Sequence, residues 1–434
     1  MTKARRDGLI LLLLGSMVFV LLGVVLENSA GNPNTDFRVL YYPARCLLQH
    51  RDPYNPAQVL TLYRAEGGHV SSDSDTGLRM VSGYVYLPNA FVFTLPFALL
   101  NWGLARILWQ ALMVASYLLA AYLIWDLAAE YAPLVAGALV CLLLANSVLL
   151  LVTANAAGIV IGLCAIAVWC FVRGRCVPAG VVCMAIALVL KPQDAGLVWL
   201  YFLLAGRVHR KRALHALLLT AALSLPMVLW VSHDAPNWRQ EWHATMAAAE
   251  ARGGTNDPGP ASEAGHGPAQ VISLQSALSI FKDDPHFYNP ISYALCAALL
   301  IAWAVVTLRG RGPQTRSWLA LAVVAALTML PVYHRQYDAK LLLLTVPACA
   351  MLWAEGSVTG RVAMLVNATA LVLTGDLTWA LLLSVINRMH GAAMLSVVLQ
   401  VFPAPCILLA TSSFYLWIYA RRTRNGGLEP ARSS

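Results

Sequence analysis

The residues with the clearest chemical potential are charged side chains at the ends of long apolar segments. Charges at membrane depth are costly and are kept where they face a cavity or a partner. The set comprises Asp36, Arg45, Asp52, Lys191, Asp194, His334, Arg335, Asp338 and Lys340. The order of the segments, described below, puts all of these ends on one side of a membrane. The pattern therefore predicts one polar cavity that opens at that face.

Three kinds of chemistry fit such a cavity. The cations Lys191, Arg335 and Lys340 are suited to cradling a phosphate. A carboxylate such as Asp36 is placed to accept a proton from an attacking hydroxyl group. Aromatic rings stack on sugar faces, and the tyrosines available for this are Tyr41, Tyr42, Tyr54, Tyr86 and Tyr337. From the residues alone, the prediction is an outward-facing cavity with cations suited to phosphate.

A structural role is open for each of these charged residues. Asp36 is a natural N-cap for the helix that follows it. Asp52 and Asn55 fit a turn and a helix cap. Lys191, which precedes a proline, fits an anchor at the membrane interface, and the cations near Asp338 fit simple ion pairs with it.

Composition decides the class of protein. The chain has 434 residues, of which 59% are hydrophobic and 12% charged, and the mean hydropathy is +0.65. A soluble domain has about 25% charged residues. Repeated apolar runs of span length predict an all-α polytopic membrane protein. The twelve predicted spans are roughly 9–26, 103–126, 133–151, 155–173, 177–190, 193–206, 212–231, 289–308, 315–331, 340–354, 361–386 and 392–419.

The basic residues set the predicted orientation. Short loops rich in Lys and Arg stay in the cytoplasm, and such clusters occur at 3–6, 207–212 and near the C-terminus. Both termini are therefore predicted to be cytoplasmic, and the chemical residues face outward. The net charge of +9 is explained by this topology and by contact with anionic lipids. Nucleic acid is not a predicted partner.

Two external loops are predicted, at 27–88 and 232–288. In the first, apolar residues at Phe37, Leu40, Tyr41, Ala44, Leu47 and Leu48 share one helical face. A helix of this kind lies along the bilayer surface, and Asn55 and Pro56 are placed to start a second short helix. The apolar run that follows Pro88 is too short to span and predicts a re-entrant or broken segment packed against protein.

The second external loop carries Trp238, Trp242 and His243. Tryptophans at such positions anchor a protein at the interface, and binding of a lipid-borne acceptor is the alternative. Elsewhere, Asp73 and Asp75 form an acidic pair that is expected to be solvated, because no other metal ligands lie nearby. No Walker loop, dinucleotide glycine pattern, Ser/His/Asp order or HExxH motif occurs. Neither a metal nor a cofactor is predicted.

Several segments together resemble glycosyltransferase family 87. They are Asp36-Phe37 through Tyr41-Tyr42 to Leu47-Leu48, then Asp52-Pro53-Tyr54-Asn55-Pro56, Tyr86-Leu87-Pro88 with Phe97 to Leu100, Lys191-Pro192-Gln193 and Tyr337-Asp338. The first two carry most of the specificity. Pro43 within the helix and Leu87-Pro88, where a second proline is common, depart from the pattern without touching a proposed chemical group.

The resemblance implies a GT-C membrane fold with interfacial helices in the first external loop, and a polyprenyl-phosphate sugar as donor. It places a catalytic acidic residue in that loop, at a position that Asp36 matches, and this residue deprotonates the acceptor hydroxyl. We expect Lys191, His334, Arg335 and Lys340 to bind the donor phosphate. The residues expected to bind sugar or acceptor are Tyr41, Tyr42, Asp52, Tyr54, Asn55, Tyr86, Asn155, Gln193, Tyr337, Asp338, Trp238 and His243.

The expected function is inverting transfer of mannose or a pentose to a lipid-linked or envelope glycan, on the outer face of a bacterial inner membrane. The alternative is a transporter or flippase of a lipid-linked or polar solute. Against that alternative, no repeated halves and no paired broken helices are visible. A non-catalytic scaffold would leave the outer charges unexplained.

Overall fold

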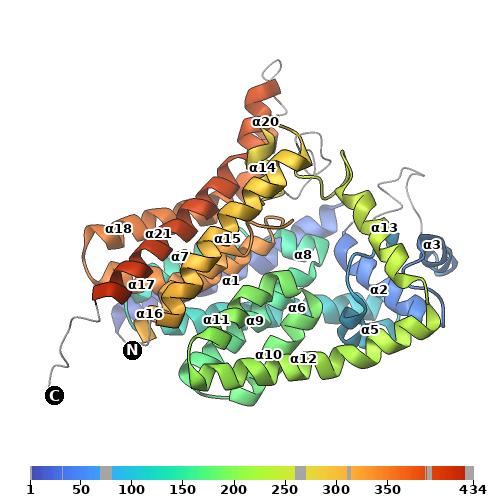
Figure 1. Ribbon diagram of the computed structural model, residues 1–434, viewed down its shortest axis with the longest axis horizontal. Coiled ribbons are helices and arrows are strands. Elements are labelled where there is room, and N and C mark those ends of the chain that lie inside the picture. Colours follow the sequence, from blue (N-terminus) through green and yellow to red (C-terminus); the bar gives the residue numbers. More distant parts are fainter. Residues whose placement is uncertain are drawn as a thin grey trace.

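The computed structural model describes residues 2–31, 33–68, 81–259, 270–309, 314–386, 388 and 393–425. Within these residues the regular secondary structure is helical apart from a single antiparallel β-bridge between Val271 and Arg335, and turns and loops join the helices. Figure 1 shows both termini toward one end of the molecule, with the helices of the first external loop at the other end. The acidic pair Asp73 and Asp75 lies outside the described residues.

Among the described residues, seven helical stretches are long and apolar enough to cross a membrane. They are α1 (Lys3–Ser29), α6 (Trp102–Ala128), α7 with α8 (Pro133–Ala145 and Leu149–Thr153), α9 (Ala156–Arg173), α12 (Arg207–Asp234), α15 (Pro285–Arg309) and the part of α20 and α21 from Val397 to Arg424. The pair α18 (Val358–Leu373) and α19 (Asp376–Ile386) makes an eighth if it counts as one span bent by 59°. The chain is thus an all-α protein of polytopic membrane character.

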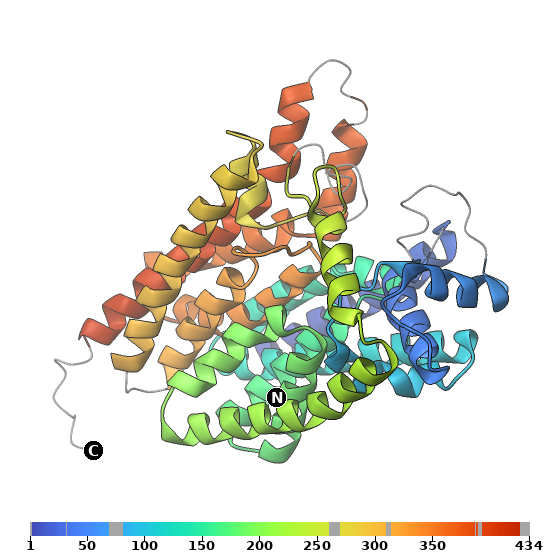
Figure 2. The same ribbon diagram turned by 45° about the vertical axis from the view of Figure 1, so that its right-hand side comes forward.

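The predicted count of twelve spans is not confirmed. Each predicted span coincides with helix, but four of them are short: α10 (Val177–Leu190), α11 (Pro192–Leu204), α16 (Gln314–Leu327), and η3 (Asp338–Thr345) with α17 (Val346–Ala354). At 1.5 Å per residue, the 14 residues of α10 reach only about 21 Å, against roughly 30 Å of hydrocarbon. These short helices lie among the longer ones (Figure 2).

In the segment 27–88, predicted to be the first external loop, two helices form where the pattern predicts them. Helix α2 (Thr35–Leu48) buries Phe37, Leu40, Tyr41, Ala44 and Leu47 completely, whereas Leu48 is partly exposed. Pro43 is accommodated inside the helix. In α3 (Pro56–Ala65), the Asn55 side chain accepts from the backbone N–H groups of Ala57 and Gln58 at 3.1 and 3.2 Å.

Aromatic stacking fixes α2 to the bundle. The Phe37 ring lies 4.6 Å from the Trp109 ring and 5.5 Å from the Trp102 ring, nearly parallel to both. The predicted broken segment forms two short helices, η1 (Pro88–Ala90) and α5 (Phe91–Ala98). Helix α5 packs against α2 and α6. Phe97 of α5 meets the Phe37 ring edge-on.

The second external loop contains α13 (Trp238–Glu250) and α14 (Leu274–Ser279). The Trp242 indole donates to the backbone oxygen of Val85 at 2.9 Å. Between the two helices, Gln270 and Ile272 pair through their backbones with the segment that carries His334 and Gln336. Helix α20 (Ala393–Val401) lies near α14, and α21 (Pro403–Asn425) runs back along α15 and α16.

Replacement of Phe37 by alanine should destabilise the fold by about 3–5 kcal/mol, the usual loss for a buried phenylalanine. The measurement is the midpoint of thermal unfolding in detergent. Leu108→Ala is the control, because Leu108 lies on α6 but is 43% exposed. Equal midpoints for the two variants would contradict the proposed anchoring of α2.

Candidate active site

Asp36 stands at the junction of α2 and α9. Its carboxylate oxygen Oδ2 accepts a 2.7 Å hydrogen bond from the side-chain nitrogen of Asn155. Asn155 is also the N-cap of α9, and its side-chain oxygen accepts from the N–H of Ala157 at 2.7 Å. The capping of α9 therefore fixes the amide that holds Asp36, and the helix dipole favours a negative charge there.

The Asp36 carboxylate is not used as a cap for its own helix. The N-cap of α2 is Asn34, in a left-handed conformation with φ of 60°, and Asp36 is the second residue of the helix. Asp36 is half-buried, and its oxygen Oδ1 has no hydrogen bond or ion pair with the part of the chain that the structure describes. One oxygen is thus fixed while the other stays available.

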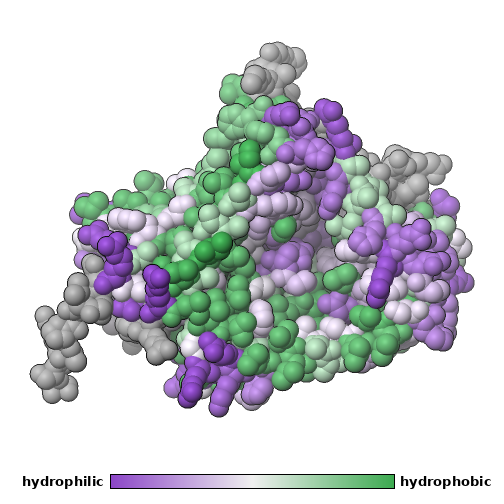
Figure 3. Space-filling model, in the orientation of Figure 1, coloured by the Kyte–Doolittle hydropathy of each residue, from purple (hydrophilic) through white to green (hydrophobic). Residues whose placement is uncertain are grey.

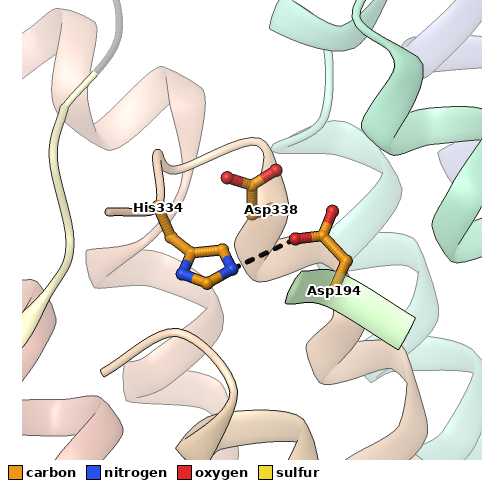
Figure 4. A group of neighbouring side chains, drawn as sticks. All are labelled: Asp194, His334 and Asp338. Atoms are coloured by element: carbon orange, nitrogen blue, oxygen red, sulfur yellow. Dashed lines mark ion pairs between the residues drawn. The ribbon is translucent and has the colours of Figure 1, made fainter. Parts of the chain in front are cut away.

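A buried ionic cluster surrounds Lys191, where α10 meets α11. Its ammonium nitrogen lies 3.1 Å from Asp194 Oδ2 and forms a close ion pair with Asp338 Oδ1. The Nε2 atom of His334 lies 3.1 Å from Asp194 Oδ1 (Figure 4). All four side chains are less than one-tenth exposed. The segments around 191, 194 and 334–338, distant in sequence, are joined at this point.

The positive charge of Lys191 is compensated within this cluster by two acidic side chains. Burial alone would lower the pKa of Lys191, but the carboxylates of Asp194 and Asp338 outweigh it and the pKa is raised. Burial raises the pKa of Asp338, and repulsion by Asp194 adds to that effect. Lys191 is therefore a charged ammonium held between two acids, and its field outside the cluster is weakened.

Arg335 and Tyr86 both interact electrostatically with Asp36. Burial alone would lower the pKa of Arg335, but the oxygens of Tyr333 and Tyr337 and the charge of Asp36 raise it. Burial raises the pKa of Tyr86. The charge of Lys191 lowers this pKa, and the charge of Asp36 raises it. The Arg335 guanidinium donates to the Tyr333 hydroxyl and to the backbone oxygen of Thr255 at 2.8 Å. Asp36 and the cluster are thus within electrostatic reach of each other.

Lys340, predicted to bind phosphate, has a full set of partners within the protein. Its ammonium donates to Asp376 at 2.9 Å and to the backbone oxygens of Asn146 and Thr374 at 2.5 and 3.2 Å. The second Asp376 oxygen accepts from the N–H of Leu149 at 2.7 Å. Lys340 is 1% exposed, so this geometry favours a clamp between helices, and its role in phosphate binding stays a prediction.

Most of the tyrosines predicted to stack on sugar lie in the core. The Tyr41 hydroxyl donates to the Leu100 oxygen at 2.7 Å, and the Tyr54 hydroxyl donates to the Tyr86 oxygen at 2.9 Å. Tyr42 stacks on Trp102. Their rings are at most 4% exposed. Tyr86 is half-buried, which makes it the best placed of the group for contact with a sugar.

The remaining predicted residues either make contacts within the protein or are exposed. Asp52 accepts from the Tyr54 N–H at 2.8 Å, as a turn residue does, and Asn55 caps α3. Trp238 packs on Tyr54, whereas Gln193 and His243 are exposed. The ring of Tyr337 lies under the ammonium of Lys191, 5.4 Å away. These contacts are structural or peripheral, and none of them tests the predicted binding roles.

Two side chains of the site received no role from the sequence. Asp194 lies one helical turn after Lys191, a spacing at which opposite charges meet, so this pair was predictable. Tyr333 supports the Arg335 guanidinium. The only feature of the sequence that pointed to Tyr333 was its place just before His334 and Arg335.

The ligand atoms of Asp194, His334 and Asp338 lie within 4.8 Å of one another. One nitrogen and two carboxylate oxygens suit a divalent cation. Lys191, however, already contacts both carboxylates. A metal would have to displace that ammonium, so the residues present fit a cation supplied by the protein better than a bound metal. The predicted absence of a metal stays a prediction.

The model of glycosyltransferase family 87 matches residues 84–333, more than half of the chain. The chain belongs to glycosyltransferase family 87. No curated protein and no solved structure matches it. The matched region contains Asn155, Lys191 and Asp194 and ends one residue before His334, while Asp36 precedes it. Membership makes this protein a glycosyltransferase, which acts on a donor and an acceptor.

The two hydrogen bonds of Asn155 can be separated by substitution. Asn155→Ser keeps a good N-cap for α9 but loses the amide that donates to Asp36. We expect thermal stability within about 0.5 kcal/mol of wild type, and sugar transfer lowered roughly 10- to 100-fold, the loss for one charge-assisted hydrogen bond. Asn155→Ala, measured in parallel, should lose both stability and activity. Full transfer by Asn155→Ser would show that Asp36 needs no such support.

Loss of the Lys191 ammonium should leave two buried carboxylates uncompensated. Lys191→Met is expected to destabilise the protein by about 3–5 kcal/mol, and Asp338→Asn in the same chain should restore part of the loss. Lys282→Met is the matched control, because Lys282 pairs with Asp284 at 2.8 Å but is 62% exposed. That change should cost no more than about 1 kcal/mol. Thermal unfolding in detergent measures all three, and a double variant no more stable than Lys191→Met would argue against coupling of the two residues.

Proposed function

We propose that this glycosyltransferase is an inverting enzyme of the GT-C fold that uses a polyprenyl-phosphate sugar as donor. The sugar is mannose or a pentose, and the acceptor is a lipid-linked or envelope glycan. The active site faces outward from a bacterial inner membrane. The observation that carries the proposal is the Asp36 carboxylate, which is fixed at one oxygen by Asn155, available at the other and coupled electrostatically to the Arg335 guanidinium.

Asp36 is the general base of the proposed reaction. Its oxygen Oδ1 takes the proton of the acceptor hydroxyl as the hydroxyl oxygen attacks the anomeric carbon. The bond between that carbon and the phosphate oxygen breaks, and polyprenyl phosphate leaves with the electron pair. Single displacement inverts the anomeric configuration. Because phosphate is a good leaving group, one carboxylate suffices, in contrast to the two carboxyl groups used in glycoside hydrolysis.

The leaving phosphate gains one negative charge, and we assign Arg335, His334 and Lys191 to stabilise it. Arg335 and the backbone around 334–338 are held by the bridge to Val271 and by Asp338, whose Oδ2 accepts from the Arg335 N–H at 2.9 Å. These donors are positioned before substrate arrives, which is the arrangement that electrostatic stabilisation requires. Figure 3 shows the face between α13 and α15 hollowed, with hydrophilic residues inside it.

The alternative is a transporter or flippase of a lipid-linked solute. Family membership favours transfer chemistry over transport. The orientation of the site and the identity of donor and acceptor rest on the resemblance and on the distribution of charge.

The test uses purified full-length protein in nanodiscs with radiolabelled polyprenyl-phosphate mannose or pentose and a crude lipid extract. We expect label to move into a new lipid with release of polyprenyl phosphate. Asp36→Asn should lower transfer by at least about 10²–10⁴-fold, the contribution of a general base, with unchanged stability. Asp284→Asn, which changes a half-buried acid paired with Lys282 in the segment 232–288, should transfer at the wild-type rate.

Two outcomes would contradict the proposal. A fully active Asp36→Asn variant would remove Asp36 from the mechanism. In sealed liposomes that contain either protein, label that crosses the membrane in both cases without entering a new lipid would establish the transporter instead.

A further inference from the structure

A second polar cavity lies at the end of the helix bundle away from Asp36. Its volume is about 670 Å³, and it lies among α11, α12, α15, α16 and α21. The polar residues that line it include Arg207, His209, Arg210, Arg316, Tyr201 and Tyr419. Nothing in the proposed transfer reaction uses this cavity.

The cavity is located where candidate spans end. Arg207 is the first residue of α12, Leu308 is the last but one of α15, and Tyr419 lies near the end of α21. Asp234, at the opposite end of α12, pairs with His50, which follows α2. The 28 residues of α12 separate the two ends by about 42 Å. The cavity is therefore remote from Asp36 and lies at the level where the candidate spans end.

The lining is cationic and carries no carboxylate among the described residues. Arg207 makes no hydrogen bond or ion pair with the described part of the chain. Arg210 donates to the Leu203 oxygen at 3.1 Å, and Arg316 reaches the Arg422 oxygen only at 3.5 Å. At these distances the two guanidinium groups keep most of their donors for another partner.

Two further donors support an anion at this position. The Nδ1 atom of His209 is buried and finds no partner among the described residues, and it donates to an anion in the tautomer that carries the proton there. Helix α12 begins after Gly206, whose φ is 111°, and has no side-chain cap. Its first N–H groups are therefore free to face an anion. Planar guanidinium groups match phosphate oxygens in pairs.

We propose that this cavity binds the phosphate of an anionic lipid headgroup. A lipid is favoured over a soluble phosphate because the cavity lies at span ends and Leu308, which also lines it, is 53% exposed. The leucines along α12 at 214, 217, 218, 225 and 229 are exposed as well, as expected for a helix that faces acyl chains. Basic pockets between spans bind phospholipid headgroups on the cytoplasmic side.

The experiment measures lipid binding to delipidated full-length protein by native mass spectrometry. Phosphatidylglycerol is titrated beside zwitterionic phosphatidylcholine, with Arg207→Gln/Arg316→Gln as the test variant. Each basic side chain near an anionic lipid contributes about fivefold, so we expect roughly thirtyfold weaker phosphatidylglycerol binding. The single variant Arg207→Gln should lose about fivefold. It removes no described contact and keeps the test independent of folding.

The control variant is Arg175→Gln/Lys211→Gln, which removes the same charge from exposed positions outside the cavity lining. Its phosphatidylglycerol affinity should change less than about twofold, since scattered surface charges contribute little. An equal loss in both double variants would overturn the proposal, because binding would then follow net charge.

Glycerol phosphate and inorganic phosphate, titrated by calorimetry, distinguish the source of the phosphate. No saturable binding of either supports a lipid headgroup. Tight binding of a soluble phosphate that is lost in Arg207→Gln/Arg316→Gln would overturn the assignment to a lipid.

Discussion

The ion pairs of Lys191 with Asp194 and Asp338 are the constraint on which the site depends. A buried charge must be paired, or the fold pays its full desolvation cost. The ammonium therefore fixes the junction of α10 and α11 against the start of η3. The loop before η3 carries His334 and Arg335, and its backbone pairs with the segment around Val271. One pairing thus orients cations from separate parts of the chain.

The compensation of the Lys191 charge also affects how the site binds an anion. Because two carboxylates compensate Lys191, the cluster does not attract an anion as strongly as its cations alone would. Arg335 is coupled electrostatically to Asp36, and its backbone N–H donates to Asp338 of the cluster. Asp36 itself depends on the cap of α9, since Asn155 serves both. Asp36 is thus held at the N-terminus of α9, whereas Lys191 is held separately by the buried acids Asp194 and Asp338.

Local pattern predicted the helices well and the packing poorly. Apolar length and flanking turns placed 155–173 and 177–190 almost as found, and Asn55 with Pro56 predicted the start of α3. Counting the predicted spans places Asp36 and Asn155 on the same side of the membrane, and their side chains are in contact. The pairing of Lys340 with Asp376 could not be predicted, because it depends on how separate helices approach one another. Burial of Tyr41 and Tyr54 was equally hidden, since a tyrosine in a core and one under a sugar look the same in sequence. Span length was the weakest inference, because the helices at 177–190, 192–204 and 314–327 are apolar yet short.

The central claim is that the donor phosphate lies among Arg335, His334 and Lys191 while Asp36 faces the anomeric carbon. The most direct measurement is an experimental structure of the Asp36→Asn variant in nanodiscs with a non-transferable polyprenyl-phosphonate sugar. The account predicts phosphonate oxygens within about 3 Å of the Arg335 donors, and the residue 36 side chain on the opposite face of the sugar. A phosphonate seated instead in the cavity beside Arg38 and Arg45, on the other side of α2, would contradict it.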